Sequence, residues 1–109
     1  MSLLLFGACN NRKVTQVHVT NNNSFPISFI IKANNSTQTF SGIKPKTEMT
    51  GEFDWTNIQK EDGQWFLFVE NENTHGRDSF AHGYFTKGEL SNYLDAISEG
   101  SKLKVKVSE

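Results

Sequence analysis

The sequence predicts an all-β domain: an antiparallel β-sandwich of seven or eight strands with Greek-key connections, or alternatively a small β-barrel. Apolar residues recur at every second position, which is the spacing of a strand with one buried face. Clusters of Asn, Ser, Gly and Pro interrupt these runs at short intervals, and no run has the 3.6-residue period of a helix. With 109 residues, the chain is long enough for one domain.

The first two strands are predicted on either side of a turn rich in asparagine. Val17 and Val19 alternate with polar residues in the first strand, and Ile27 to Ile31 alternate in the second. Residues 21–24 separate the two strands, because Asn and Ser side chains favour turns. We expect these two strands to pair as a hairpin.

Four further strands are predicted in the middle of the chain. Thr37 to Phe40 is a short candidate, and Glu48 to Trp55 is the next. Gln64 to Glu70 is apolar on both faces, which indicates a central strand. Ser79 to Phe85 is interrupted by Gly83, where we expect a β-bulge or a close approach of another backbone segment.

The last two strands form the clearest predicted hairpin. Tyr93 to Ile97 and Leu103 to Val107 flank the turn residues Glu99-Gly100-Ser101. The alternating apolar side chains of the last strand should face the core and its lysines the solvent, where charge guards an edge strand against aggregation. A helical turn is conceivable at Lys87 to Tyr93 alone.

The single cysteine, Cys9, follows an apolar run that ends in two small residues. The motif Phe6-Gly7-Ala8-Cys9, with polar residues after it, resembles the lipobox of bacterial lipoproteins. The resemblance implies cleavage before Cys9 and attachment of a diacylglycerol to its thiol. No positive charge precedes the apolar run, so we expect Met1-Ser2, or Met1 to Leu3, to replace the natural beginning of the signal.

We therefore interpret residues 1–13 as the remnant of a lipoprotein signal, an acylation site and a short tether, and residues 14–109 as a β-sandwich domain. The domain resembles, in outline, the transthyretin-like and C2-like sandwiches of several small periplasmic lipoproteins. Arg12-Lys13 differs from the acidic residues that mark surface-exported lipoproteins in some lineages. The expected location is the bacterial cell envelope, on the periplasm-facing side of the outer membrane.

No pattern of catalytic or metal-binding residues is present. His18, His75 and His82 lie on three segments without the spacing of metal ligands, and a serine as close to a histidine as Ser79 is to His82 is expected by chance. The formal net charge of -1 gives no basic footprint for nucleic acid. We expect no enzyme activity, no metal, no cofactor and no nucleic-acid partner.

The aromatic residues give the best indication of function. Their number between residues 53 and 85 exceeds what one face of a sandwich normally buries, although filling the core from both sheets would also account for them. The candidate ligand- or partner-binding residues are Trp55, Trp65, Phe66, His82, Tyr84 and Phe85. We expect a lipid-anchored binding or assembly module with a protein partner, and the alternatives are a carbohydrate-binding module and a small envelope enzyme.

Overall fold

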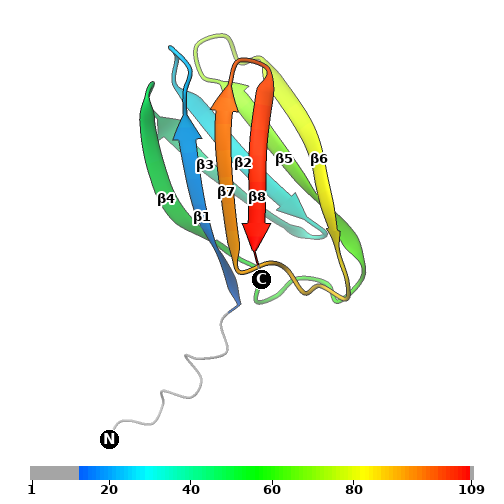
Figure 1. Cartoon of the computed structure of the whole chain (residues 1–109). Coiled ribbons are helices and arrows are strands. Elements are labelled where there is room, and N and C mark those ends of the chain that lie inside the picture. The colour runs from blue at the N-terminus through cyan, green and yellow to red at the C-terminus, as the bar shows by residue number, and fades with distance from the viewer. Residues whose placement is uncertain (1–12, 109) are drawn as a thin grey trace, which may run out of the picture.

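The computed structural model describes residues 13–108, which form a sandwich of two four-stranded sheets (Figure 1). The strands are β1 Val14–Asn21, β2 Ile27–Ala33, β3 Ser36–Ile43, β4 Thr47–Asp54, β5 Gly63–Asn71, β6 Arg77–Phe85, β7 Tyr93–Glu99 and β8 Lys102–Ser108. Sheet A has the order β4-β1-β7-β8, and sheet B has the order β3-β2-β5-β6. The predicted all-β sandwich is confirmed, and the barrel alternative is wrong because the strands form two separate sheets.

One pair of neighbouring strands departs from the antiparallel pattern. β1 runs parallel to β7 and antiparallel to β4, whereas the remaining neighbours in both sheets are antiparallel. This strand order resembles the transthyretin-like arrangement among the sandwiches expected. The hairpin expected between the first two strands is wrong, because β1 belongs to sheet A and β2 to sheet B.

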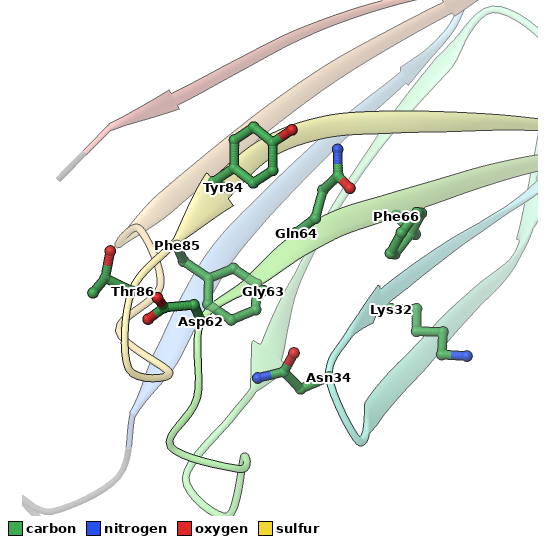
Figure 2. A pocket seen from close by; sticks show the side chains of 9 residues that line it. All are labelled: Lys32, Asn34, Asp62, Gly63, Gln64, Phe66, Tyr84, Phe85 and Thr86. Carbon is green, nitrogen blue, oxygen red and sulfur yellow. The ribbon is translucent and has the colours of Figure 1, made fainter.

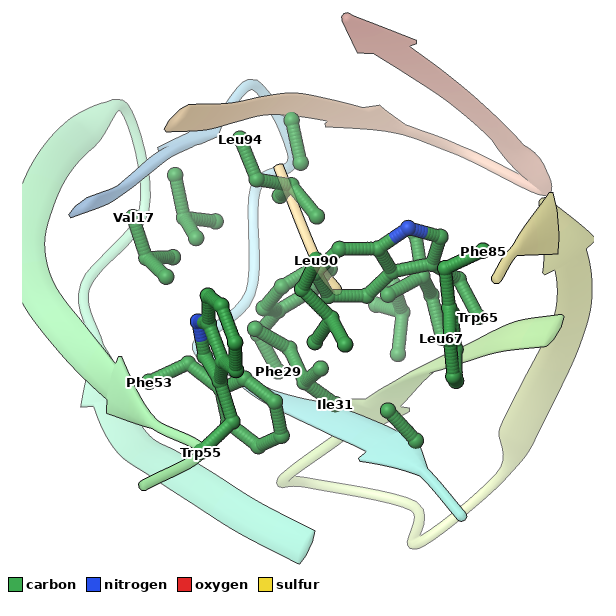
Figure 3. Close-up of a cluster of buried hydrophobic side chains, with 14 of the residues drawn as sticks. Val17, Phe29, Ile31, Phe53, Trp55, Trp65, Leu67, Phe85, Leu90 and Leu94 are labelled. Atoms are coloured by element: carbon green, nitrogen blue, oxygen red, sulfur yellow. The ribbon is translucent and has the colours of Figure 1, made fainter. Parts of the chain in front are cut away.

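The hydrophobic core lies between the sheets and is built by inward-facing residues of the strands, with Trp55, Ile58 and Leu90 added from the loops (Figure 3). Val17 and Val19 of β1 face Phe29 and other fully buried residues of β2. The ring centroids of Phe53 and Trp65 are 6.1 Å apart, so sheet A and sheet B meet through aromatic contact. Most of the aromatic side chains between residues 53 and 85 therefore pack into or against the core.

A buried polar network holds the chain where it passes from sheet A to sheet B. The side-chain amide of Asn21 donates to the carbonyls of Phe25 and Ile43, each at 2.9 Å. Its oxygen accepts hydrogen bonds from the backbone and side-chain amides of Asn23, which also donates to Ser98 Oγ at 3.0 Å. These bonds satisfy buried polar groups at the point where the chain crosses between the sheets.

Two local expectations differ from the structure. Lys87 to Tyr93 contains no helical turn, and the backbone instead makes an isolated bridge from Thr86 to Glu89. In β8 the inward side chains become more exposed along the strand, and Val107 is 37% exposed. β8 is the outermost strand of sheet A, so sheet B covers it incompletely. No helix long and apolar enough to cross a membrane occurs within residues 13–108.

Candidate functional site

The structure gives limited information on two of the predicted site residues, Cys9 and His82. Cys9, with the rest of the expected lipoprotein signal, lies outside the described residues. His82 is placed by its backbone, which pairs with Trp65 in the ladder between β6 and β5.

Three of the predicted aromatic residues belong to the core. Trp55, Trp65 and Phe85 are all buried, and the rings of Trp65 and Phe85 meet edge to face with centroids 6.3 Å apart. The indole nitrogen of Trp55 donates to Thr15 Oγ1 at 3.1 Å, which satisfies its one polar atom. Burial gives Trp55, Trp65 and Phe85 a packing role.

Phe66 and Tyr84 are exposed, and the structure brings them together at one cavity on the outer face of sheet B (Figure 2). Tyr84 is 82% exposed and Phe66 is 41% exposed. The cavity has a volume of about 550 Å³, within the range of small-ligand pockets. Its walls are formed by Lys32, Asn34, Asp62, Gly63, Gln64, Phe66, Tyr84, Phe85 and Thr86.

A β-bulge at Gly83 directs Tyr84 to this cavity. In the ladder Gln64 pairs with Tyr84 and Trp65 pairs with His82, so Gly83 is one extra residue on β6. Its φ of 65° lies in the left-handed region that glycine adopts at little cost. Without the extra residue, strict alternation would turn Tyr84 inward and Phe85 outward. The bulge predicted at Gly83 is confirmed, and it exposes one ring while it buries the next.

The floor of the cavity depends on a second glycine. A Cβ at Gly63 would lie 2.6 Å from Cζ of Phe85 and would also collide with Oδ1 of Asn34. The absence of a side chain at Gly63 therefore lets Asn34 and Phe85 approach each other beneath the cavity.

Some polar side chains in the cavity wall are hydrogen bonded to the protein backbone, and others have no partner within residues 13–108. Asn34 donates to the carbonyls of Gln59 and Glu61 at 3.2 and 3.1 Å, and Asp62 Oδ1 accepts from the backbone amide of Lys87 at 2.9 Å. Within residues 13–108, the side chains of Lys32 and Gln64 have no hydrogen-bond or ionic partner. Two side chains are thus held in place by the protein, and two are available to a ligand.

Sequence reasoning missed the polar part of this site. Lys32 and Gln64 stand next to or opposite Phe66 and Tyr84 in the ladders, on the same outer face. Isolated polar residues on a strand are ordinarily solvent-facing, so the sequence offered no reason to single them out. The one usable signal was the even spacing of Gln64 and Phe66, which places both on one face of a strand.

The histidines described in full do not gather into a site. His18 lies on the outer face of sheet A between two carboxylates, and His75 lies in the turn between β5 and β6, 3.5 Å from Glu70. In the part of the chain that the structure describes, no three His, Cys, Asp or Glu side chains come together as metal ligands.

Glu70 and Glu72 form separate contacts at the opposite end of sheet B. The Arg77 guanidinium, together with His75, holds the pKa of Glu70 below its usual value. Hydrogen bonds from Ser28 Oγ at 2.6 Å and from the amide of Gly42 at 2.8 Å lower the pKa of Glu72. Both carboxylates are therefore stabilised in the ionised form, which does not suit a general acid.

Comparisons with known proteins support the fold alone. No family model matches the chain, and no curated protein matches it. A solution structure of a protein from Eubacterium rectale superimposes with a TM-score of 0.52 and 10% sequence identity, over 86% of this chain and 87% of that one. At this identity the likeness shows that the two chains share an architecture.

Proposed function

We propose that this protein is a lipid-anchored binding module of the bacterial cell envelope that takes its ligand at the cavity lined by Phe66 and Tyr84. The observation that carries the proposal is the exposure of two aromatic rings beside a concave surface with unpartnered polar groups. Exposing aromatic area to water is unfavourable, so a surface of this kind is more common at binding sites than elsewhere. In this proposal the protein binds and positions a partner and catalyses no reaction.

Two classes of ligand fit such a surface. A protein partner, which the sequence favoured, would use the wider outer face of sheet B, where Phe68 continues the row from Phe66. A carbohydrate is favoured by the cavity itself, since its lining combines aromatic rings with polar side chains.

The proposed anchor would place the cavity near the membrane. Lys13, the first described residue, donates through its backbone amide to Thr56 Oγ1 at 3.0 Å and accepts from the amide of Trp55 at 2.8 Å. The loop that follows β4 and the loop that precedes β7 lie at this same end of the sandwich (Figure 1). Asp62 and Thr86, which line the cavity, belong to these two loops. A tether of residues 10–13 spans at most roughly 15 Å when extended. Acylated Cys9 in the outer membrane would thus hold this end of the domain close to the bilayer on the periplasmic side.

Hydroxyl-radical footprinting in intact envelopes tests whether this surface is occupied. We expect Tyr84 to be modified several-fold more slowly in the envelope than in the purified domain, because a ligand covers it. Tyr93, which is 39% exposed in sheet A, is the matched control and should react equally in both samples. Equal reactivity of Tyr84 in the two samples would contradict the proposal.

A further inference from the structure

We propose that the ligand of the cavity is an uncharged glycan, with Tyr84 and Phe66 as its stacking surfaces. The inference rests on the proposed function, because it names the ligand class of that same site. Three features of the cavity support it: its aromatic rings, its mixture of hydrogen-bonding groups and its balanced charge.

The aromatic rings suit the apolar face of a sugar. A pyranose ring presents C–H groups on its faces and hydroxyl groups around its edge, so it can lie on an aromatic ring while its edge stays hydrogen bonded. Tyr84 and Phe66 stand on the neighbouring strands β6 and β5, and Gln64 pairs with Tyr84 in the ladder and precedes Phe66 by two residues on the same face of β5 (Figure 2). Such an arrangement offers two flat surfaces with a polar group beside both.

The hydrogen-bonding groups match hydroxyl groups. Each sugar hydroxyl donates one hydrogen bond and accepts others. Lys32 supplies donors and the Gln64 amide supplies both kinds of group, while the Asp62 carboxylate, whose Oδ1 already accepts from Lys87, has further acceptor sites on its two oxygens. A site for a purely accepting ligand, such as a phosphate, would not need an acceptor in its wall.

The charge of the wall favours a neutral ligand. Lys32 and Asp62 are the two charged residues among the nine that line the cavity, and their formal charges cancel. An acidic sugar would be attracted by Lys32 but repelled by Asp62, and the reverse holds for a basic ligand. A neutral sugar meets neither penalty.

The site is also largely formed before any ligand arrives. Backbone hydrogen bonds hold Asn34 and Asp62, and the bulge at Gly83 fixes the direction of Tyr84. These three residues then lose little conformational entropy on binding, and the main ordering cost falls on Lys32 and Gln64. The volume of about 550 Å³ suits a short stretch of an oligosaccharide.

Titration of the ¹⁵N-labelled domain with neutral oligosaccharides tests the inference. Suitable probes are tetramers of α-1,4-glucose, β-1,4-glucose and β-1,4-N-acetylglucosamine, with a tetramer of galacturonic acid as the acidic comparison. We expect at least one neutral tetramer to bind saturably, to shift the amide signals of Gln64, Phe66 and Tyr84, and to leave those of sheet A unchanged. Tyr84→Ala should weaken this binding at least tenfold, while Tyr93→Ala should not change it.

The outcomes separate this inference from the proposed function. If no neutral tetramer binds at millimolar concentration, or if the acidic tetramer binds more tightly than every neutral one, the neutral-glycan inference is overturned. Protection of Tyr84 in intact envelopes would then still support a binding module, with a protein or an acidic glycan as the ligand. Reactive, unprotected Tyr84 would instead overturn the proposed function itself.

Discussion

Nδ1 of His18 lies 2.9 Å from Oδ1 of Asp95, across the parallel pairing of β1 with β7. On its other side, Nε2 of the same ring lies 2.6 Å from Oε1 of Glu48 on β4. A neutral imidazole could donate to one of these carboxylates, whereas the protonated ring donates to both. The hydrogen bonds to Asp95 and then to Glu48 therefore raise the pKa of His18 above its ordinary value of 6.5.

Protonated His18 should stabilise the domain in a pH-dependent manner. Because the folded-state pKa is raised, this contribution is fully present below the unfolded value of 6.5 and is lost as the pH rises through the higher folded value. Urea unfolding of the wild type and His18→Gln from pH 5.5 to 9 measures it. The free energy of unfolding of the wild type should exceed that of the variant most at the acidic end of this range. A difference in free energy that stays constant from pH 5.5 to 9 would contradict the raised pKa of His18.

Trp65 and Phe66 are neighbours in sequence but should differ sharply in their effect on stability. Trp65 is 2% exposed and contacts the rings of Phe53 and Phe85, so Trp65→Ala should reduce the free energy of unfolding by about 3–5 kcal/mol. Phe66→Ala, on the outer face, should change it by no more than about 1 kcal/mol. Equal losses in chemical denaturation would mean that the strand faces are assigned wrongly.

Gly83→Ala should strain the bulge without causing a collision. An added Cβ would lie 3.8 Å from Cδ1 of Trp65, an ordinary contact, but a φ of 65° costs a residue with a side chain about 1–2 kcal/mol. The free energy of unfolding should fall by this amount. Gly76→Ala is the control, since Gly76 does not have a positive φ and should tolerate the change.

Asn21→Ala should be among the costlier polar substitutions. The substitution removes the buried side-chain amide that donates hydrogen bonds to the carbonyls of both Phe25 and Ile43. We expect a loss of about 3 kcal/mol in the free energy of unfolding. The adjacent Asn22 is exposed, so Asn22→Ala should be nearly neutral, and a comparable loss there would point to a general effect of the turn.

The proposed lipid anchor is testable in cells that express the chain behind a complete lipoprotein signal. The wild type should take up labelled fatty acid and fractionate with membranes, because each buried CH₂ of an acyl chain contributes about 0.8 kcal/mol. Cys9→Ala should lose the label. Acyl label and fractionation must both be measured, since an uncleaved signal could hold the variant at the membrane. A soluble, unlabelled wild type would contradict the lipoprotein interpretation.

Strand positions could be predicted from the sequence because side-chain alternation is a local property. Val17 and Val19, and likewise Ile27 and Phe29, fall on the buried faces that the two-residue period predicts. The assignment of strands to sheets was not predictable in this way. Residues 21–26 resemble a hairpin turn, yet the Asn21 network instead directs the chain across the core.

The candidate site was predictable only in part, for a related reason. Apolar content marked Trp65, Phe66, Tyr84 and Phe85 as a group, but which of Tyr84 and Phe85 faces outward depends on one extra residue at Gly83. The partners across the strands, such as Lys32 opposite Phe66, depend on the register between β2 and β5. Register is a property of the whole sheet, and no single segment of the sequence contains it.

The position of β1 between β4 and β7 also sets the order in which the protein can fold. The contacts of His18 on β1 reach Glu48, 30 residues later, and Asp95, 77 residues later. Bringing such distant segments together costs chain entropy before any contact compensates for it, so folding should be slow, on the order of milliseconds to seconds. β1 is the first strand to leave a ribosome or a translocation channel, yet it would be among the last strands to have both neighbouring strands in place. The pairing of β1 with β7 must therefore wait until the C-terminal hairpin of β7 and β8 has emerged.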